Sequence, residues 1–184
     1  MSLRIATFNL ENLDDDVAVS PPLAERMQIM RPQLERVGAD IICFQEIHSQ
    51  GSANSRTLSA LDQLLNGTPY TGFHRQTTLT TSGQLYDRRN LITLSRFPIL
   101  DTQVLRDSSG PRPSYQMATA SPPDPMANAL EWERPLLYTQ IDMGSGGTLH
   151  LINVHLKSKL ASTIPGQKID NFTWRTVSAW AEGS

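Results

Sequence analysis

Asp40-Ile41-Ile42-Cys43-Phe44-Gln45-Glu46 is an apolar run that ends on an amide and a carboxylate. Continuous apolar runs of this length, bounded by polar residues, are typical of strands that are buried on both faces. A second such run, residues 149–158 (Leu-His-Leu-Ile-Asn-Val-His-Leu-Lys-Ser), carries Asn153 and His155 in its second half. Because functional groups collect at the ends of buried strands, the two runs predict a sheet that presents polar side chains at one edge.

Other segments supply the remaining elements of an α/β chain. Residues 3–10 alternate between apolar and polar and predict a first strand. Apolar residues recur at helical spacing from Leu23 to Val37, where Gly38 is a suitable C-terminal cap and Pro32 predicts a kink or a break. The sequence then predicts a helix at 55–65, strands at 70–78, 90–95 and 99–105, a surface loop at 107–129, a hairpin of 135–143 with 148–155, and the start of a helix at 171–181.

Composition narrows the class of protein. The 184 residues suffice for one domain, with 39% hydrophobic and 18% charged residues. The single cysteine, Cys43, excludes an intrachain disulfide and a cysteine-based zinc site, and we expect it to be buried. A net charge of −2 argues against a broad basic face for nucleic acid, but these basic residues can still form a local rim: Arg88, Arg89, Arg96, Lys157, Lys159 and Arg175.

The N-terminus runs directly into the first predicted strand, without the pattern of a signal peptide. No apolar run reaches the length needed to cross a membrane. We therefore expect a cytoplasmic protein, unless a leader has been removed ahead of the first residue.

Polar residues follow two predicted strands that both lead into helices. Asn9 and Glu11 come just after the first strand, and Glu46 ends the second. Strands with helical connections can lie parallel and adjacent, so we expect Asn9 and Glu46 to meet at one edge of the sheet. A carboxylate there can hold Mg2+, and His155 can exchange a proton with a phosphate oxygen. Taken alone, each of these residues could equally be a turn residue or a solvated strand end. A functional role is favoured because the residues are expected to converge.

The remaining histidines and one arginine carry weaker signals. His48 and His74 lack a surrounding motif, and we expect surface or structural roles for them. His150 should face the opposite side of its strand from His155, near the solvent end of the hairpin. Arg134 precedes a predicted strand and is either an exposed cation or a phosphate contact.

Four motifs, in this order, resemble those of the endonuclease/exonuclease/phosphatase superfamily. They are Thr7-Phe8-Asn9-Leu10-Glu11-Asn12, residues 40–46, residues 90–99 (Asn-Leu-Ile-Thr-Leu-Ser-Arg-Phe-Pro-Ile) and residues 151–158 (Leu-Ile-Asn-Val-His-Leu-Lys-Ser). The superfamily includes DNase I, apurinic endonucleases, neutral sphingomyelinases and inositol-phosphate phosphatases. The resemblance therefore implies a phosphoester hydrolase without choosing between DNA, RNA, phospholipid and small phosphate substrates. It also implies a DNase I-like four-layer α/β sandwich, in which two packed β-sheets carry helices outside.

The resemblance implies roles for individual residues. Glu46 resembles the main metal-binding glutamate, with Glu11 as an acidic neighbour, and the implied cofactor is Mg2+ or Mn2+. Asn9 resembles the asparagine beside the metal and the scissile phosphate, and His155 resembles the histidine that contacts and polarises that phosphate. Arg134 and Asn153 are also expected to contact the substrate phosphate.

The sequence also departs from the superfamily. It resembles only the N-terminal portion, because a Gly-Asp-x-Asn strand end and a C-terminal Ser-Asp-His segment are both lacking. We therefore expect residues 1–184 to form a single domain without the C-terminal part of the fold. The isolated chain should then hydrolyse phosphoesters poorly, because its nucleophile-activating residues are missing. The alternative is a non-catalytic binding half-domain that keeps the scaffold without turnover.

The predicted sandwich has a consequence for partners. We expect the strands that end in Asn9, Glu46, Ser95 and His155 to share one sheet, with the two predicted helices over one face. The other face needs a second sheet, of which this chain holds only a part. We therefore expect the missing C-terminal half, or a second copy, to cover an apolar face. Nucleic acid is one of the substrates that the sequence leaves open.

Overall fold

The computed structural model describes residues 2–18, 20–106, 110–132, 134–156 and 160–184. The chain divides into two compact units. Unit 1 consists of Met1–Arg106 and Arg134–His155, and unit 2 consists of Asp107–Glu133 and Leu156–Ser184. The expectation of one domain over residues 1–184 stays a prediction.

The described part of unit 1 contains two β-sheets. Their strands are β1 (Ile5–Leu13), β2 (Ile41–Ile47), β3 (His74–Thr77), β4 (Asn90–Ser95), β5 (Ile99–Leu105), β8 (Leu136–Asp142) and β9 (Thr148–Asn153). The first sheet has the order β1-β2-β4-β3, with β1 parallel to β2 and the other pairs antiparallel. The second sheet has the order β5-β8-β9 and is antiparallel throughout. The predicted parallel neighbours β1 and β2 are therefore confirmed.

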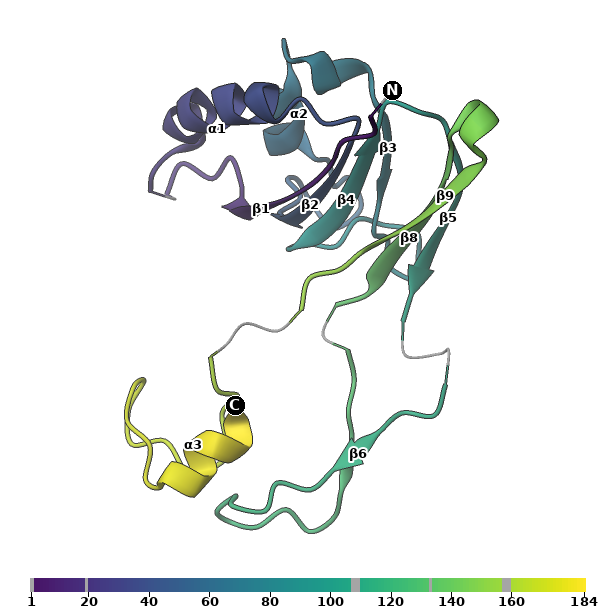
Figure 1. Cartoon of the computed structure of the whole chain (residues 1–184). Coiled ribbons are helices and arrows are strands. Elements are labelled where there is room, and N and C mark those ends of the chain that lie inside the picture. Colours follow the sequence, from purple (N-terminus) through teal and green to yellow (C-terminus); the bar gives the residue numbers. More distant parts are fainter. Residues whose placement is uncertain (1, 19, 107–109, 133, 157–159) are drawn as a thin grey trace. The chain divides into compact units, whose positions relative to one another are not determined.

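Two helices cover one face of the first sheet, α1 (Leu23–Val37) and α2 (Ser59–Leu65) (Figure 1). Burying the apolar stripe of each helix against the sheet is the main force that holds this layer in place. The fully buried side chains of this core come from both layers: Leu10, Leu13, Leu34, Ile42, Phe44, Ile47, Leu61, Leu64 and Ile92.

Helix α1 runs through Pro32 without the break that was one of the two predicted outcomes. Proline removes one helical hydrogen bond, so other contacts must hold the second half of the helix in place. Arg31 provides such a contact, because its side chain donates to the carbonyl oxygens of Gln63 and Leu64 at the end of α2. Tyr70 Oη donates to Leu34 O at 2.8 Å, and Gly38 ends the helix in the left-handed conformation predicted for it.

Three other element boundaries differ from the sequence-based expectations. Helix α2 begins at Ser59 rather than at residue 55. The strand expected at 70–78 begins only at His74, because Pro69–Gly72 forms a 3-10 turn. Within unit 2, α3 (Val177–Gly183) starts six residues later than expected, at a Thr176 side-chain cap.

The second sheet packs against the other face of the first. Strand β4 contacts β8 and β9, and β3 contacts β5, so unit 1 has a layer of helices followed by two layers of sheet. The predicted α/β sandwich with two packed sheets is confirmed. The expectation that Asn9 and His155 end strands of one sheet is wrong, because β9 pairs with β8 in the second sheet. The hairpin of β8 and β9 is antiparallel and has no room beside β4, whose two neighbours are β2 and β3.

Cys43 lies buried between the sheets, as expected. Burial raises the pKa of the Cys43 thiol to about 11, although a hydrogen bond with Thr93 lowers it in part. The thiol is therefore protonated at neutral pH and serves as a small packing residue rather than a nucleophile.

Asn153 joins the two sheets through buried hydrogen bonds. Its Nδ2 donates to Phe44 O at 3.0 Å and to Ile92 O at 3.1 Å, on two strands of the first sheet. Its Oδ1 accepts from Gln45 Nε2 at 2.8 Å. The side chain is 2% exposed, so the carbonyl groups of Phe44 and Ile92 would each lose a buried donor if the amide were removed.

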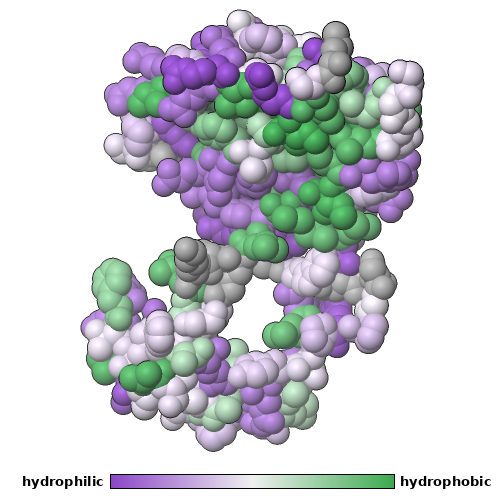
Figure 2. All heavy atoms as spheres, in the orientation of Figure 1, coloured by the Kyte–Doolittle hydropathy of each residue, from purple (hydrophilic) through white to green (hydrophobic). Residues whose placement is uncertain are grey.

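The edge strand β9 presents apolar side chains to solvent. Ile152 is 54% exposed and Val154, just after the strand, is 38% exposed, while Ile5 on β1 is 47% exposed. In Figure 2, which has the orientation of Figure 1, hydrophobic atoms gather over β9. The expectation that another chain or segment covers these residues stays a prediction. Among the described residues, the helices are all too short or too polar to cross a membrane.

Unit 2 is built around one carboxylate. It contains α3 and the paired strands β6 (Ser114–Tyr115) and β7 (Asn128–Ala129), within the region expected to be a loop. Glu182 accepts hydrogen bonds from Tyr115 Oη at 2.6 Å, from the backbone N–H groups of Ala118 and Thr119, and from Thr119 Oγ1. The bonds from Thr119 and Tyr115 hold the pKa of Glu182 at about 2.

We predict that replacing Asn153 with alanine lowers the free energy of unfolding by about 2–3 kcal/mol, because two buried carbonyl groups lose their donor. Urea unfolding followed by circular dichroism measures the change. Thr148→Ala, an exposed substitution on the same strand, is the control. A loss no larger than that of the control would contradict a role of Asn153 in joining the sheets.

We predict that unit 2 loses stability as the pH falls from about 4.5 towards 2. The pKa of Glu182 is depressed on folding, so its contribution is present above the ordinary value of 4.5 and is lost as the pH falls through about 2. All three tryptophans, Trp132, Trp174 and Trp180, belong to unit 2, so tryptophan fluorescence during urea unfolding isolates this unit.

In the same experiment, Glu182→Gln should remove the pH dependence in this window, and Glu131→Gln, an exposed change in the same unit, should leave it in place. An identical acid response of wild type and Glu182→Gln would contradict the prediction.

Candidate functional site

Glu46 sits at a β-bulge that re-aims its side chain. In β2, Ile42 and Phe44 face the helix layer, and strict alternation would place Glu46 in the same apolar core. Pairing with β4 instead shifts register between Phe44 and Ile47, and Glu46 takes a left-handed backbone with φ of 60°. The next residue to enter the core is therefore Ile47, and the carboxylate of Glu46 is released to the other side.

The end of β1 contains a matching irregularity. Its register against β2 shifts between Asn9 and Leu13, and Glu11 and Asn12 have φ of 46° and 52°. Asn9 Oδ1 accepts from Glu11 N at 2.8 Å, which closes a tight turn. The outcome is a bulged loop within the last part of β1, residues 9–12, that carries polar side chains past the edge of the core.

Arg26 of α1 holds this loop by donating hydrogen bonds to the loop's backbone carbonyl groups. Its guanidinium donates to Leu10 O, to Glu11 O at 3.0 Å and to Asn12 O at 3.3 Å. A planar guanidinium with several donors can bind three neighbouring carbonyl oxygens at once, which a lysine cannot do in the same geometry. Helix α1 thus fixes the loop as well as covering the sheet.

The carboxylate of Glu46 is the point where the predicted residues meet. Its Oε1 lies 3.2 Å from Asn9 Nδ2 and 3.2 Å from His155 Nε2, and its Oε2 accepts from Asn12 N at 3.1 Å. The side chains of Glu46 and His155 are 17% and 16% exposed, so the site is partly screened from water but remains open. The convergence of Asn9 with Glu46 is confirmed, and His155 reaches them from the second sheet.

Arg134 lies behind His155, with Nη1 2.5 Å from His155 Nδ1. A guanidinium can only donate, so Nδ1 accepts and the ring proton of a neutral His155 lies on Nε2. That N–H then donates to Glu46 Oε1. The contact between Arg134 and His155 therefore selects the tautomer that presents a hydrogen-bond donor to the site.

Other residues from the sequence-based set lie further from this centre. Glu11 is exposed, and no contact joins its carboxylate to Glu46 among the described residues. Asn153 is buried between the sheets, a placement that favours joining the sheets over contacting a phosphate. Arg96 of the predicted rim pairs with Asp40 near the opposite end of β2, and Arg175 belongs to unit 2. Lys157 and Lys159 lie outside the described residues.

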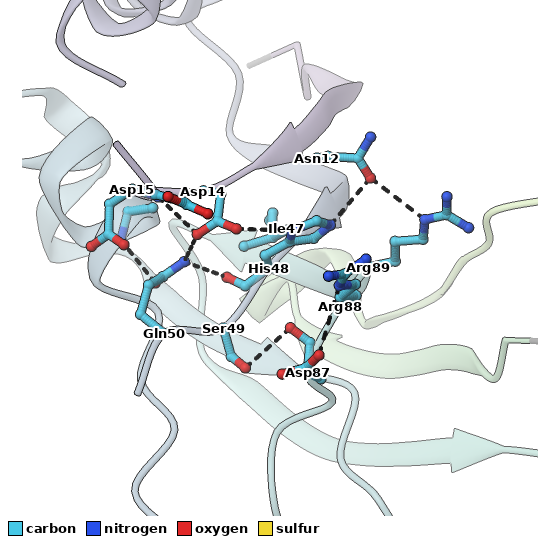
Figure 3. A network of polar contacts seen from close by, with 12 residues as sticks. Asn12, Asp14, Asp15, Ile47, His48, Ser49, Gln50, Asp87, Arg88 and Arg89 are labelled. Carbon is cyan, nitrogen blue, oxygen red and sulfur yellow. Dashed lines mark hydrogen bonds and ion pairs between the residues drawn. The ribbon is translucent and has the colours of Figure 1, made fainter. Parts of the chain in front are cut away.

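A second group of polar residues, which includes His48, stands next to the site (Figure 3). His48 Nδ1 lies 3.1 Å from Asp14 Oδ2, and His48 Nε2 lies 3.1 Å from Asn12 Oδ1. Burial raises the pKa of Asp14, but hydrogen bonds from Gln50 and His48 outweigh it and leave the pKa below the ordinary value. No local sequence signal marks this group, because His48 lies 34 residues from Asp14 and 36 residues from Asn12 along the chain.

The part of the chain that the structure describes contains no group of three or more histidine, cysteine or acidic side chains able to hold a metal ion. A metal at Glu46 would therefore have one or two protein ligands and depend on water for the rest. Mg2+ accepts such a site, because it keeps several waters and often binds through one or two carboxylates.

Comparison with known proteins bears on the fold. No family model matches the sequence, and the search of curated proteins gives no match. An endonuclease/exonuclease/phosphatase family protein from Leptotrichia buccalis has a similar structure, with a TM-score of 0.51 and 13% identity over 90% of this chain and 59% of that one. A protein described by the same family name, from Bacteroides thetaiotaomicron, matches with a TM-score of 0.45 and 17% identity over 76% of this chain and 42% of that one.

The first of these matches shows that the chain has the fold of an endonuclease/exonuclease/phosphatase family protein, as the sequence motifs implied. The chain spans 59% of the length of that solved structure. At 13% identity the likeness concerns the fold alone, so activity has to be argued from the site.

We predict that Arg26→Met lowers the free energy of unfolding by about 1–2 kcal/mol, because the carbonyl groups of Leu10, Glu11 and Asn12 lose a charged donor. Methionine keeps much of the apolar stem, so the change isolates the guanidinium. Chemical unfolding measures the loss, with Arg36→Met at the exposed end of the same helix as the control. Equal losses in the two variants would mean that Arg26 does not hold the loop.

Proposed function

We propose that the chain carries the metal- and phosphate-binding part of a metal-dependent phosphoester hydrolase of the endonuclease/exonuclease/phosphatase family. The observation that carries the proposal is the meeting of Asn9, Glu46 and His155 around one carboxylate, at the ends of strands from two sheets. The shared fold supports the proposal. The sequence motifs support it as well, because Asn9, Glu46 and His155 each belong to one of them.

The residues present fit a hard divalent cation. Glu46 would hold Mg2+ or Mn2+ with water in most positions, and Glu11 is an exposed second carboxylate on the adjoining loop. A bound divalent ion would neutralise the charge of a phosphate and polarise its oxygens. Oxygen ligands alone, without sulfur and with few imidazoles, favour Mg2+ or Mn2+ over zinc.

The chain's own residues then bind and orient the phosphate. His155 presents Nε2–H towards Glu46, so it can donate to a non-bridging phosphate oxygen that comes close to the carboxylate. Arg134 keeps His155 in this tautomer and adds a positive charge behind it. Asn9 Nδ2 offers a further donor at the same carboxylate oxygen. Developing negative charge on a phosphate would therefore meet donors that are already in place.

The buried Asn153 has a supporting part in this proposal. It lies two residues before His155, and its partner Gln45 directly precedes Glu46. The buried amide pair therefore sets the separation of the two residues that define the site. We propose this positioning task for Asn153 in place of direct contact with a substrate phosphate.

The substrate class is a phosphate mono- or diester. The described basic residues near the site, Arg89 and Arg134, suit a phosphate group but do not form a long basic track. A small phosphoester, a phospholipid headgroup and a nucleic-acid backbone share this chemistry. Hydrolysis also needs a group that activates water, so turnover by this chain alone is expected to be low.

We predict that the chain binds Mn2+ weakly at Glu46. Titration with Mn2+ should broaden NMR signals of residues 9–12 and 45–47 first, because paramagnetic broadening falls steeply with distance from the ion. Glu46→Gln removes the charge and keeps the size of the side chain, and it should weaken Mn2+ binding at least tenfold. Glu35→Gln, at an exposed position on α1, is the matched control.

Equal broadening in wild type and Glu46→Gln would contradict the proposed metal site. A companion assay follows hydrolysis of bis(4-nitrophenyl) phosphate. Binding of inorganic phosphate that requires His155 and Arg134, without turnover, would favour the alternative of a binding half-domain. Fast Mn2+-dependent turnover would show that the water-activating group lies within residues 1–184.

A further inference from the structure

We propose that His48 is a positioning residue that holds the backbone N–H of Asn12 on the carboxylate of Glu46. Among the described residues, no hydrogen bond or ion pair joins His48 to Glu46, so His48 acts through Asn12. The consequence for metal binding rests on the proposed function of Glu46, but the positioning itself is a property of the chain alone.

Three atoms of Asn12 are held by three different elements. Asn12 N donates to Glu46 Oε2 at 3.1 Å, Asn12 O accepts from Arg26 of α1, and Asn12 Oδ1 lies 3.1 Å from His48 Nε2. Figure 3 shows the Asn12 amide turned towards the ring of His48. Asn12 thus links the carboxylate of the site to a histidine that follows β2 by one residue.

The backbone of Asn12 makes this support necessary. Its φ of 52° lies in the left-handed region, which non-glycine residues occupy only at some cost. A residue in that conformation relaxes unless neighbouring contacts favour it. Asparagine tolerates the region better than most residues because its short amide can form local hydrogen bonds, and here that amide bonds to His48.

Other contacts hold the side chain and the backbone of His48 in place. Its Nδ1 lies 3.1 Å from Asp14 Oδ2, and Asp14 Oδ1 accepts from Gln50 Nε2 at 3.1 Å. Gln50 also donates to His48 O at 3.0 Å and accepts from Ala60 N at 3.1 Å, in the first turn of α2. The ring of His48 therefore has one orientation, set by groups on the loop after β1 and on α2.

Arg89 does not replace His48 in this task. Its Nε lies 3.5 Å from the same Asn12 Oδ1, at the outer limit of a hydrogen bond, and its side chain is exposed. His48, with 13% of its side chain exposed, makes the shorter and better screened contact. Loss of the His48 contact should therefore free the Asn12 amide even with Arg89 present.

The test compares two substitutions that differ by one methylene. In His48→Gln, the terminal amide nitrogen reaches about as far as Nε2 and can still donate to Asn12. In His48→Asn, it reaches about as far as Nδ1 and can donate only towards Asp14. Hydrogen exchange of the Asn12 N–H, followed by NMR on the whole chain, reads out how firmly that group is held.

We predict that His48→Asn lowers protection of the Asn12 amide about 5- to 10-fold, the size of one hydrogen bond, and that His48→Gln keeps it close to wild type. Protection of amides in β4 should not change. Asn12→Gly, which accepts the left-handed backbone and removes the whole side chain including Oδ1, should lower protection at residue 12 as His48→Asn does. His74→Asn, at an exposed histidine, is the control.

Wild-type protection in His48→Asn or in Asn12→Gly would overturn the proposal, as would equal loss in the Gln and Asn variants of His48. Mn2+ titration of the same proteins forms the second arm. If exchange responds as predicted and Mn2+ binding weakens in His48→Asn, both proposals stand. If exchange responds but wild type shows no Mn2+ binding that depends on Glu46, the positioning role stands and the metal site fails.

Discussion

A buried hydrogen bond between two amides, Gln45 Nε2 to Asn153 Oδ1 at 2.8 Å, is the constraint on which the rest of the site depends. Each amide lies next to a residue of the candidate site, since Gln45 precedes Glu46 and Asn153 lies two residues before His155. Asn153 also donates to main-chain oxygens on both β2 and β4, so its amide is fully used. In an apolar interior a satisfied polar pair tolerates little displacement, because any slip leaves buried groups without partners. The relative position of the two sheets, and hence of Glu46 and His155, follows from this pair.

Around this fixed frame the backbone departs from regular geometry. Glu11, Asn12, Glu46 and Arg89 are non-glycine residues with φ between 46° and 60°. Contacts of Asn12 with Glu46 and with Arg89 place all of them near one end of the first sheet. Backbone conformations of this kind cost free energy and persist where surrounding contacts over-determine them. At this site those contacts are the guanidinium of Arg26, the carboxylate of Glu46 and the ring of His48. Side-chain direction here is thus set by hydrogen bonds rather than by strand alternation.

The sequence alone was sufficient for the parallel pair of β1 and β2, the hairpin of β8 and β9, and the meeting of Asn9 with Glu46. Those features follow from apolar periodicity, turn residues and strand order.

The sequence alone was insufficient for features that long-range contacts determine. Pro32 predicted a broken helix, but the contact of Arg31 with α2 holds α1 together. His155 was expected in the sheet of Glu46, but it reaches Glu46 from the facing sheet. The bulge at Glu46 cannot be deduced from alternation, which would bury that carboxylate, and His48 gives no local signal because its partners Asp14 and Asn12 are more than 30 residues away.

The large separation along the chain between Gln45 and Asn153, 108 residues, gives the site a place in the order of folding. The first sheet and its helices need only residues 5–95, and most of their pairings are between neighbouring segments. The pairing of Gln45 with Asn153 must wait for the hairpin of β8 and β9, and closing so long a loop is slow because its entropy is lost before the contact forms. During synthesis, Asn9 and Glu46 would therefore come together well before His155 arrives. The chain would pass through a stage with a formed carboxylate centre and an open interior face, in which the facing sheet that completes the site is the last part to be added.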